Sequence, residues 1–282
     1  MTLWSHAKSL ASLVVITGQL TFWMVLLILA SLVKLVVPPL RPLADRSMDQ
    51  MYRIAVAIDD GWLRGVLGID WNRPPLGLDR NRTYVVLANH ASWSDIFLLQ
   101  SVLVRDGPVL KFLVKRSLMW IPIFGVVFWA FDFPMLRRRA RSGEDEAARR
   151  QTDLAALRAA CAVVRERPAA LMVFAEGTRF TPEKQVQRES PYRHLLAPRV
   201  GGVSALLEAL GADVDAVLDV TLVYPRPVSF WAFISGALPA VEIGVERIAP
   251  EAVPTERDAL ACWLDERWRQ KDARIEAARR AD

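Results

Sequence analysis

The feature that most restricts the fold of this chain is an uncharged segment near its N-terminus. It covers residues 9–33 and reads SLASLVVITGQLTFWMVLLILASLV. A helix needs about 20 residues to cross the hydrocarbon core of a bilayer, so this segment is long enough. Pro38 and Pro39 follow and would end such a helix. We therefore predict a membrane-anchoring helix within residues 1–46.

The sequence leaves open whether this anchor is cleaved, spans the membrane or re-emerges on the same face. A cleaved signal peptide is an alternative, but no small-x-small cleavage site precedes Lys34. Gly18 and Gln19 interrupt the apolar run, so a helix that re-emerges on the same face competes with a spanning one. Three basic residues follow the run and only Lys8 lies close before it, which predicts that the remaining chain lies on the cytoplasmic side. The three are Lys34, Arg41 and Arg46.

The composition restricts the kinds of molecule that this protein is expected to bind. The 282 residues are 52% hydrophobic, include ten Trp and carry a formal net charge of +5. This combination favours an anionic membrane surface or an acidic small substrate. No zinc-finger spacing, basic heptad region or RNA-binding aromatic strand is present, so we expect no nucleic-acid partner. The only cysteines, Cys161 and Cys262, have no metal or redox spacing, which predicts a reducing compartment and no metal site.

The remainder of the chain alternates predicted strands and helices. Residues 47–72 show helical spacing of apolar residues and predict an amphipathic connecting helix, which either lies on the membrane or packs in the protein. Residues 73–282 predict one further domain with strands at 83–88, 171–175 and 217–223, and with helices at 94–104, 145–167, 203–210 and 256–280. The alternation predicts an α/β fold with a central sheet and covering helices.

The first chemical motif is NHASWSD, which follows the strand predicted at 83–88. Ligands of open α/β sheets bind outside the carboxyl ends of the strands. Asp95 could orient His90 so that one ring nitrogen acts as a base. No G-x-S-x-G nucleophile motif is present, so the activated hydroxyl belongs to the substrate, which indicates direct transfer of a group to an alcohol. The His–Asp spacing requires a turn into a helix, with Ser92 or Ser94 as a cap. A chance pair, or a His that only caps a polar turn, is the alternative.

The second motif is FAEGTRF, which also follows a predicted strand. Gly177 permits a tight turn. Arg179 offers a planar fork that suits a phosphate, and Thr178 adds a hydroxyl. Glu176 could accept a hydrogen bond from a substrate hydroxyl or hold Arg179. A purely structural Glu–Arg pair is the alternative.

NHASWSD and EGTR together resemble the motifs of the glycerophospholipid acyltransferase family, typified by 1-acyl-glycerol-3-phosphate acyltransferases. The family motif N-H-x-S-x-x-D matches at Asn89, His90, Ser92 and Asp95, and F-x-E-G-T-R matches at 174–179. KFLVKRSLMWIPIFG and HLLAPRVGG resemble further segments of this family. The usual G-x-x-F-I-x-R motif is reduced to FDFPMLR, in which only Arg137 matches. The neighbouring Arg138, Arg139 and Arg141 leave the phosphate-binding arginine of that segment undecided.

The resemblance implies a glycerol-3-phosphate acyltransferase-like fold and an activity. A fatty acyl group would pass from an acyl thioester, either acyl-CoA or acyl-carrier protein, to the free hydroxyl of a lysophospholipid. The foremost acceptor is 1-acyl-glycerol-3-phosphate, which gives phosphatidic acid. His90 would be the general base, with Asp95 orienting it. The implied substrate-binding residues are Asn89, Ser92, Lys111, Arg137, Glu176, Gly177, Thr178 and Arg179.

The resemblance also implies a setting. We expect no bound cofactor or metal, membrane lipids as partners, and a place at the inner membrane with the catalytic domain on the cytoplasmic side. Residues 117–131 are apolar but too short to span comfortably. They either line an acyl groove, dip into the leaflet or belong to the core. The alternatives are a different lysophospholipid acceptor, a lipid-binding protein that keeps the fold without catalysis, and a phosphoester-cleaving enzyme.

Overall fold

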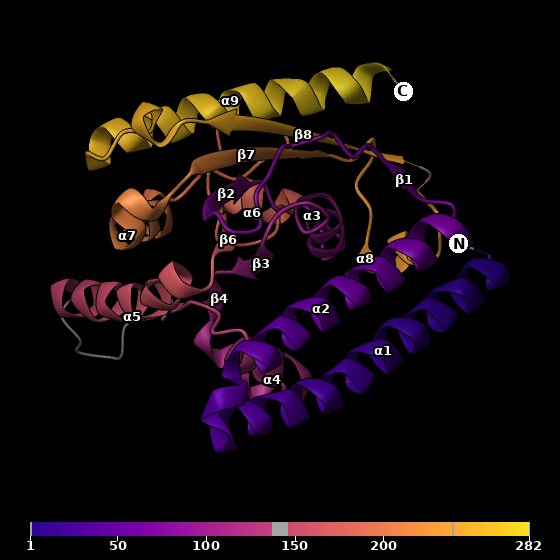
Figure 1. Ribbon diagram of the computed structural model, residues 1–282. Helices are drawn as coiled ribbons and strands as arrows, with labels where there is room; N and C mark the ends of the chain where they lie inside the picture. Colours follow the sequence, from indigo (N-terminus) through magenta and orange to yellow (C-terminus); the bar gives the residue numbers. More distant parts are fainter. Residues whose placement is uncertain (1, 137–145, 239, 282) are drawn as a thin grey trace.

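The centre of the molecule is a six-stranded, mostly parallel sheet (Figure 1). The computed structural model describes residues 2–136, 146–238 and 240–281. The strand order is β1-β8-β7-β2-β6-β3, and β8 runs antiparallel to β7. The strands are β1 (Asp70–Trp71), β2 (Tyr84–Ala88), β3 (Val109–Phe112), β6 (Ala169–Phe174), β7 (Ala216–Val223) and β8 (Ala240–Ile248). A separate parallel pair joins β4 (Val114–Lys115) and β5 (Met135–Leu136).

The three central strands are the ones that the sequence predicts. β2 and β7 are buried along their whole length, and β6 is buried except at its last residue. Strands covered on both faces carry continuous apolar runs rather than alternation, which is why they stand out in the sequence. The parallel register pairs Ala88 of β2 with Phe174 of β6 and Val220 of β7. The motifs that follow β2 and β6 therefore leave the sheet at the same edge.

Helices cover both faces of the sheet, which confirms the predicted α/β class. The helices α5 (Glu146–Glu166), α7 (Val200–Leu210) and α9 (Arg257–Ala281) share one hydrophobic core. The opposite core contains α1 (Leu3–Val36), α2 (Arg41–Asp60), α3 (Asp95–Leu103), α4 (Pro122–Ala130) and α8 (Phe230–Phe233). Shorter turns are η1 (Pro38–Leu40), η2 (Gly61–Val66), η3 (Arg116–Trp120), η4 (Gly211–Asp213) and η5 (Pro250–Ala252).

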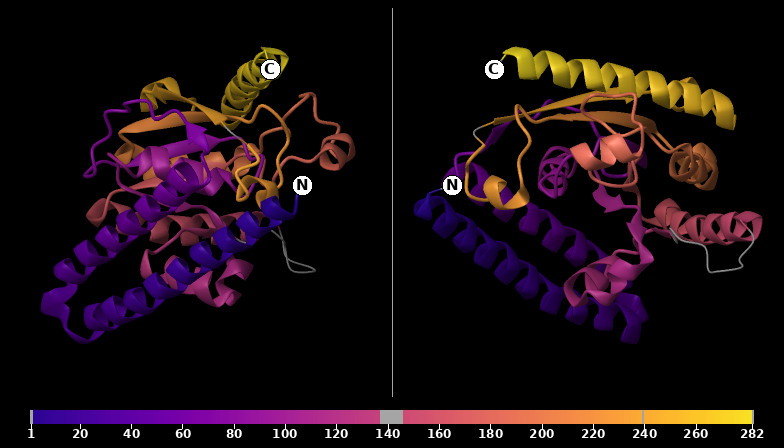
Figure 2. Two further views of the ribbon diagram at one scale, coloured as in Figure 1. Left: turned by 90° about the vertical axis from the view of Figure 1, so that its right-hand side faces the viewer. Right: turned by 180° about the vertical axis from the view of Figure 1, so that it is seen from behind.

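The N-terminal segment forms a helical hairpin in which α1 and α2 lie side by side (Figures 1 and 2). Among the described residues, α1 is the one helix long and apolar enough to cross a membrane, and only 11% of that span is buried. Polar contacts nevertheless hold α1 to the rest of the molecule. Ser9 Oγ donates to the Trp231 carbonyl at 2.8 Å, and Trp62 Nε1 donates to Ser12 Oγ at 2.9 Å. The second helix begins at Arg41, inside the range predicted for the anchor.

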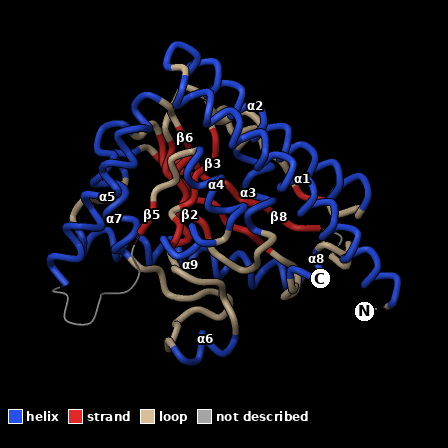
Figure 3. The backbone as a smooth tube through the Cα atoms, turned by 90° about the horizontal axis from the view of Figure 1, so that it is seen from below, coloured by secondary structure: helices blue, strands red, loops and turns tan. Residues whose placement is uncertain are grey.

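The apolar segment 117–131 forms most of η3 and all of α4, and α4 packs against both α1 and η3. Phe128 and Phe131 face the core, whereas Trp120 is 89% exposed. Three further large apolar side chains are exposed here: Ile121, Phe124 and Trp129. This segment therefore has one face in the core and one face outside it. The loop that contains α6 (Pro182–Gln187) follows the EGTR motif and lies away from α1 and α4 (Figure 3).

Candidate active site

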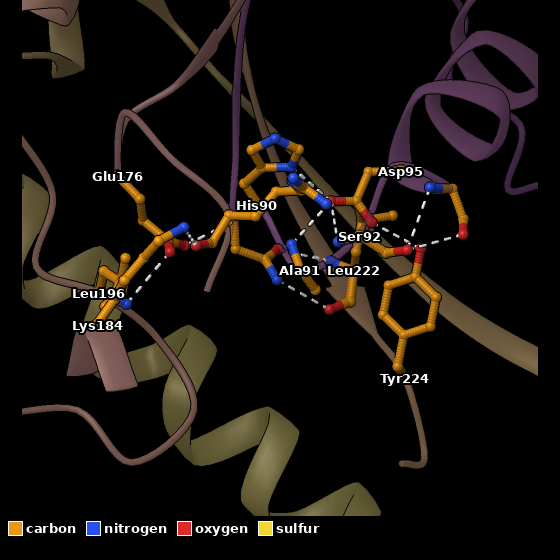
Figure 4. Close-up of polar contacts among 12 residues, drawn as sticks. His90, Ala91, Ser92, Asp95, Glu176, Lys184, Leu196, Leu222 and Tyr224 are labelled. Atoms are coloured by element: carbon orange, nitrogen blue, oxygen red, sulfur yellow. Dashed lines mark hydrogen bonds and ion pairs between the residues drawn. The ribbon is translucent and has the colours of Figure 1, made fainter. Parts of the chain in front are cut away.

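The two motifs meet at the edge where β2 and β6 end. Two backbone contacts join them directly. The His90 N–H donates to Glu176 Oε1 at 3.2 Å, and the Phe180 N–H donates to the His90 carbonyl at 2.7 Å. Residues about 86 positions apart in the chain thus form one site (Figure 4).

His90 and Asp95 form a hydrogen-bonded pair. His90 Nδ1 lies 2.8 Å from Asp95 Oδ2, and Asp95 is fully buried. The same oxygen accepts the N–H groups of Ala91 and Ser92 at 2.8 and 3.0 Å. An ionised carboxylate can only accept, so the proton of this contact sits on Nδ1 and Nε2 remains a proton acceptor. His90 keeps 14% of its side chain exposed, which leaves the ring accessible to a substrate.

An aromatic ring fixes the plane of the imidazole. Phe174, the last residue of β6, stacks on His90 with ring centroids 3.8 Å apart and planes 14° apart. Phe174 in turn contacts Phe112 of β3, at 6.3 Å between centroids. The sequence analysis matched Phe174 to a family motif but assigned it no role. It lies 84 positions from His90, and no local spacing indicates such a contact.

Asn89 and Ser92 are buried and bond other groups of the protein, and their contact with a substrate stays a prediction. Asn89 is 1% exposed, and its amide both donates to and accepts from the backbone of Leu222 at 3.0 and 2.8 Å. These bonds tie the end of β2 to β7. Ser92 is 4% exposed, and its hydroxyl contacts Ser94 Oγ at 2.9 Å. Ser94 occupies the N-cap position of α3, but its side chain makes no capping bond.

Glu176 bonds backbone groups of the protein, and its contact with a substrate stays a prediction. Its side chain is fully buried, and its two oxygens accept the backbone N–H groups of His90 and Leu196, each at 3.2 Å. Burial raises the pKa of Glu176 to about 8, although these two donors act in the opposite direction. Glu176 therefore connects the His90 turn to the loop before α7.

The remaining EGTR residues lie at the surface of the site. Gly177 has φ +70°, a conformation that explains a glycine there. The Arg179 guanidinium stacks over the Trp93 ring at 4.7 Å and forms no ion pair with a described carboxylate. Lys184 Nζ donates to Thr178 Oγ1 at 2.9 Å and to the Arg179 carbonyl at 3.0 Å. Lys184 brings a second cation to this loop, and no motif in the sequence indicates it.

Lys111 has charged neighbours other than the two motifs, and its contact with a substrate stays a prediction. It lies on the edge strand β3 and is 3% exposed. Burial lowers the pKa of its amine to about 8, with a further contribution from Arg167. Its charged surroundings come from Asp49 and Asp132 rather than from the two motifs. Arg137, with Arg138, Arg139 and Arg141, lies outside the described residues.

Comparison with known proteins identifies the family of this chain. A family profile described as Acyltransferase matches residues 73–225, which is more than half of the chain. Lysocardiolipin acyltransferase 1 of Gallus gallus is 28% identical over 68% of this chain and 52% of its own length. The 1-acyl-sn-glycerol-3-phosphate acyltransferase epsilon of Mus musculus is 26% identical over 68% of this chain and 57% of its own length. The chain thus spans about half the length of the curated relatives that it matches.

A solved structure shares the fold. The crystal structure of the 1-acyl-sn-glycerophosphate (LPA) acyltransferase PlsC from Thermotoga maritima superimposes with a TM-score of 0.53 at 17% identity. The match covers 93% of this chain and 98% of that one. From the family match, supported by the relatives, the chain belongs to the glycerophospholipid acyltransferase family.

Proposed function

We propose that this protein transfers a fatty acyl group from a thioester to the free hydroxyl of a lysophospholipid, with 1-acyl-glycerol-3-phosphate as the foremost acceptor. One observation carries the proposal. A His–Asp pair with one unblocked ring nitrogen is joined by hydrogen bonds to a loop that presents an arginine with no carboxylate partner among the described residues. A base beside a cation suits an acceptor that contains both a hydroxyl and a phosphate.

The chemistry follows from the two ring nitrogens of His90. Nε2 takes the proton of the acceptor hydroxyl while the oxygen attacks the thioester carbonyl. The imidazolium then returns this proton to the departing thiolate. Asp95 holds the Nδ1–H and stabilises the imidazolium between the two steps. Base catalysis of this kind contributes about 10²–10⁴-fold to the rate.

Arg179 is the proposed phosphate ligand. Because its guanidinium face rests on Trp93, its N–H edges stay available for two parallel bonds to phosphate oxygens. Lys184, held against the same loop, adds a second positive charge. The named relatives act on 1-acyl-glycerol-3-phosphate or lysocardiolipin. Both acceptors contain phosphate, which supports a phosphate-bearing acceptor here. Acyl-CoA and acyl-carrier protein remain the two proposed donors.

The proposed setting is the inner membrane, with the site on the cytoplasmic side. The exposed apolar side chains of α1 and of η3–α4 support contact of this side of the molecule with the bilayer. From α4, successive ring contacts lead inward to His90, which supports this path as the lining for the acyl chain. The rings in order are Phe124, Phe128, Phe133, Phe112, Phe174 and His90.

The direct test is an acyl-transfer assay with the full chain in anionic bilayers. Labelled acyl-CoA and acyl-carrier protein would each be offered with 1-acyl-glycerol-3-phosphate, lysocardiolipin, lysophosphatidylglycerol and lysophosphatidylcholine. We expect a diacyl product that forms fastest from 1-acyl-glycerol-3-phosphate. Lysolipid binding without thioester consumption would identify a non-catalytic lipid-binding protein instead. Release of inorganic phosphate would identify a phosphoester hydrolase.

A further inference from the structure

The two carboxylate oxygens of Asp95 have different partners. Oδ2 contacts His90 and two backbone N–H groups. Oδ1 has a single described side-chain partner, the hydroxyl of Tyr224, at 2.6 Å (Figure 4). Tyr224 lies 129 positions beyond Asp95, outside both motifs. The buried Tyr224 side chain therefore extends the hydrogen-bonded pair of His90 and Asp95.

The fold places Tyr224 firmly at this position. It follows directly after β7, and the Asn89 amide fixes Leu222 of β7 to the end of β2. The C-terminal helix adds a further contact, because Arg279 Nε donates to the Tyr224 carbonyl at 3.2 Å. Tyr224 is 3% exposed and its ring belongs to the hydrophobic core. The hydroxyl thus reaches Asp95 from a backbone held on two sides.

The direction of this hydrogen bond is determined by the chemistry of its partners. A carboxylate has no proton to give, so the Tyr224 hydroxyl is the donor. Burial, reinforced by the adjacent Asp95 charge, holds the pKa of Tyr224 well above its ordinary value, so the phenol keeps its proton. A bond from a neutral donor to a buried anion is short and strong, as the 2.6 Å separation shows.

We propose that Tyr224 is a positioning residue for acyl transfer, which holds Asp95 in one rotamer and draws electron density away from the oxygen that faces His90. Its kinetic consequence rests on the proposed function. Without the phenol, more negative charge stays on Oδ2. The imidazolium form of His90 is then favoured, and less of the free base is present at a given pH.

The other ionisable groups around the pair do not obscure this effect. Glu176 faces His90 from the loop after β6, and Arg179 lies beyond it on Trp93. Apart from Asp95, α3 contains no ionisable residue, and α8 contains none. Replacing Tyr224 by Phe leaves all of these groups in place, so a change in titration reports the lost hydroxyl.

The test compares Tyr224→Phe with Tyr192→Phe. Tyr192 is a matched control because it is also buried and its hydroxyl also bonds a carboxylate, that of Asp265 on α9. In Tyr224→Phe we expect kcat to fall about tenfold, since one bond to a charged group is lost. Both KM values should stay within about twofold, and the acidic limb of the kcat–pH profile should move upward by about half a pH unit. Tyr192→Phe should keep the wild-type profile. An acidic limb that is equal in Tyr224→Phe and wild type would overturn the proposal.

A second readout does not depend on enzymatic activity. The chain contains three His, so the imidazoles of isotope-labelled protein can be resolved by NMR and His90 assigned with a His90→Gln variant. We expect His90 to titrate at higher pH in Tyr224→Phe than in wild type, with His6 and His194 unchanged. If wild type transfers no acyl group but this difference is present, only the proposed function fails. If the His90 titrations coincide, the inference about Tyr224 fails whatever the activity.

Discussion

At the scale of single residues, the site holds His90 from several directions. Asp95 binds one edge of the ring, Phe174 covers one face, and Glu176 and Phe180 bond the backbone on either side. A general base needs this fixed geometry, because a small displacement of the reacting nitrogen lowers the rate strongly. Most polar residues of the two motifs therefore hold the shape of the site, and Arg179 is the residue for which we propose a contact with the substrate.

Arg179→Gln tests the proposed phosphate contact. Loss of two charge-assisted bonds, each worth roughly 1.5–3 kcal/mol, predicts a KM for 1-acyl-glycerol-3-phosphate at least about tenfold higher. The KM of the acyl donor should be unchanged, and a neutral monoacylglycerol acceptor should be affected little. Arg193→Gln is the control, since Arg193 lies in a nearby loop but is exposed and ion-paired with Glu276. Equal acceptor KM values for the two variants would exclude Arg179 as the phosphate ligand.

Glu176→Gln tests the buried carboxyl through stability. The pKa of Glu176 is raised from 4.5 to about 8, so its contribution to stability is fully present below pH 4.5 and is lost as the pH rises through 8. Relative to Glu176→Gln, wild type should lose roughly 2–4 kcal/mol of unfolding free energy between pH 5 and 9. Denaturant unfolding of both proteins across this range measures the difference. Parallel pH profiles would show that Glu176 is not the group that titrates.

The sequence predicted the contact between His90 and Asp95, which the structure shows, but not the contacts of the neighbouring residues. Asn89 and Glu176 have side chains that suit a substrate, but burial and backbone partners decide their use, and neither is visible in a motif. Tyr224, Phe174 and Lys184 reach the site only through the sheet register and the loop after β6. No local spacing in the sequence predicts the contacts of these three residues.

At the scale of elements, the α1–α2 hairpin and α4 carry the exposed apolar side chains that we propose to contact a membrane. The apolar runs of α1, β2, β6 and β7 were long and uniform enough to be predicted. The strand β8 was not predicted, because its exposed Glu and Arg residues interrupt the apolar pattern. The strand β3, which is only four residues long and contains Lys111, was also not predicted.

Contact between η3–α4 and the bilayer can be measured at Trp120. With Cys262 changed to Ser, Trp120→Cys labelled with an environment-sensitive fluorophore should shift to the blue on addition of anionic vesicles. Lipid-borne quenchers should reduce its emission. The control is Val186→Cys on α6, which is 77% exposed and lies away from α1 and α4 (Figure 3). We expect strong quenching at position 120 and little at 186, because only the first belongs to the apolar surface. Equal quenching would rule out this surface as the membrane contact.

At the scale of the whole molecule, the two faces of the sheet have different roles. One face carries the hairpin, α3, α4 and α8, with the apolar surface and the aromatic series that leads to His90. The other carries α5, α7 and α9 (Figure 2), and Arg279 of α9 contacts the Tyr224 carbonyl next to the site. His90, the proposed base, thus lies between the layer with the exposed apolar surface and the layer formed by α5, α7 and α9.

The most direct measurement of the central claim is the rate of acyl transfer by His90→Ala and His194→Ala. His194 is a suitable control, because it is also paired with a carboxylate, with its Nε2 at 2.6 Å from Glu276 Oε2, but lies outside the two motifs. If His90 is the general base, His90→Ala should lose about 10²–10⁴-fold in kcat, with its thermal unfolding little changed. His194→Ala should retain activity within about threefold of wild type. A His90→Ala protein that is folded and as active as His194→Ala would contradict the account.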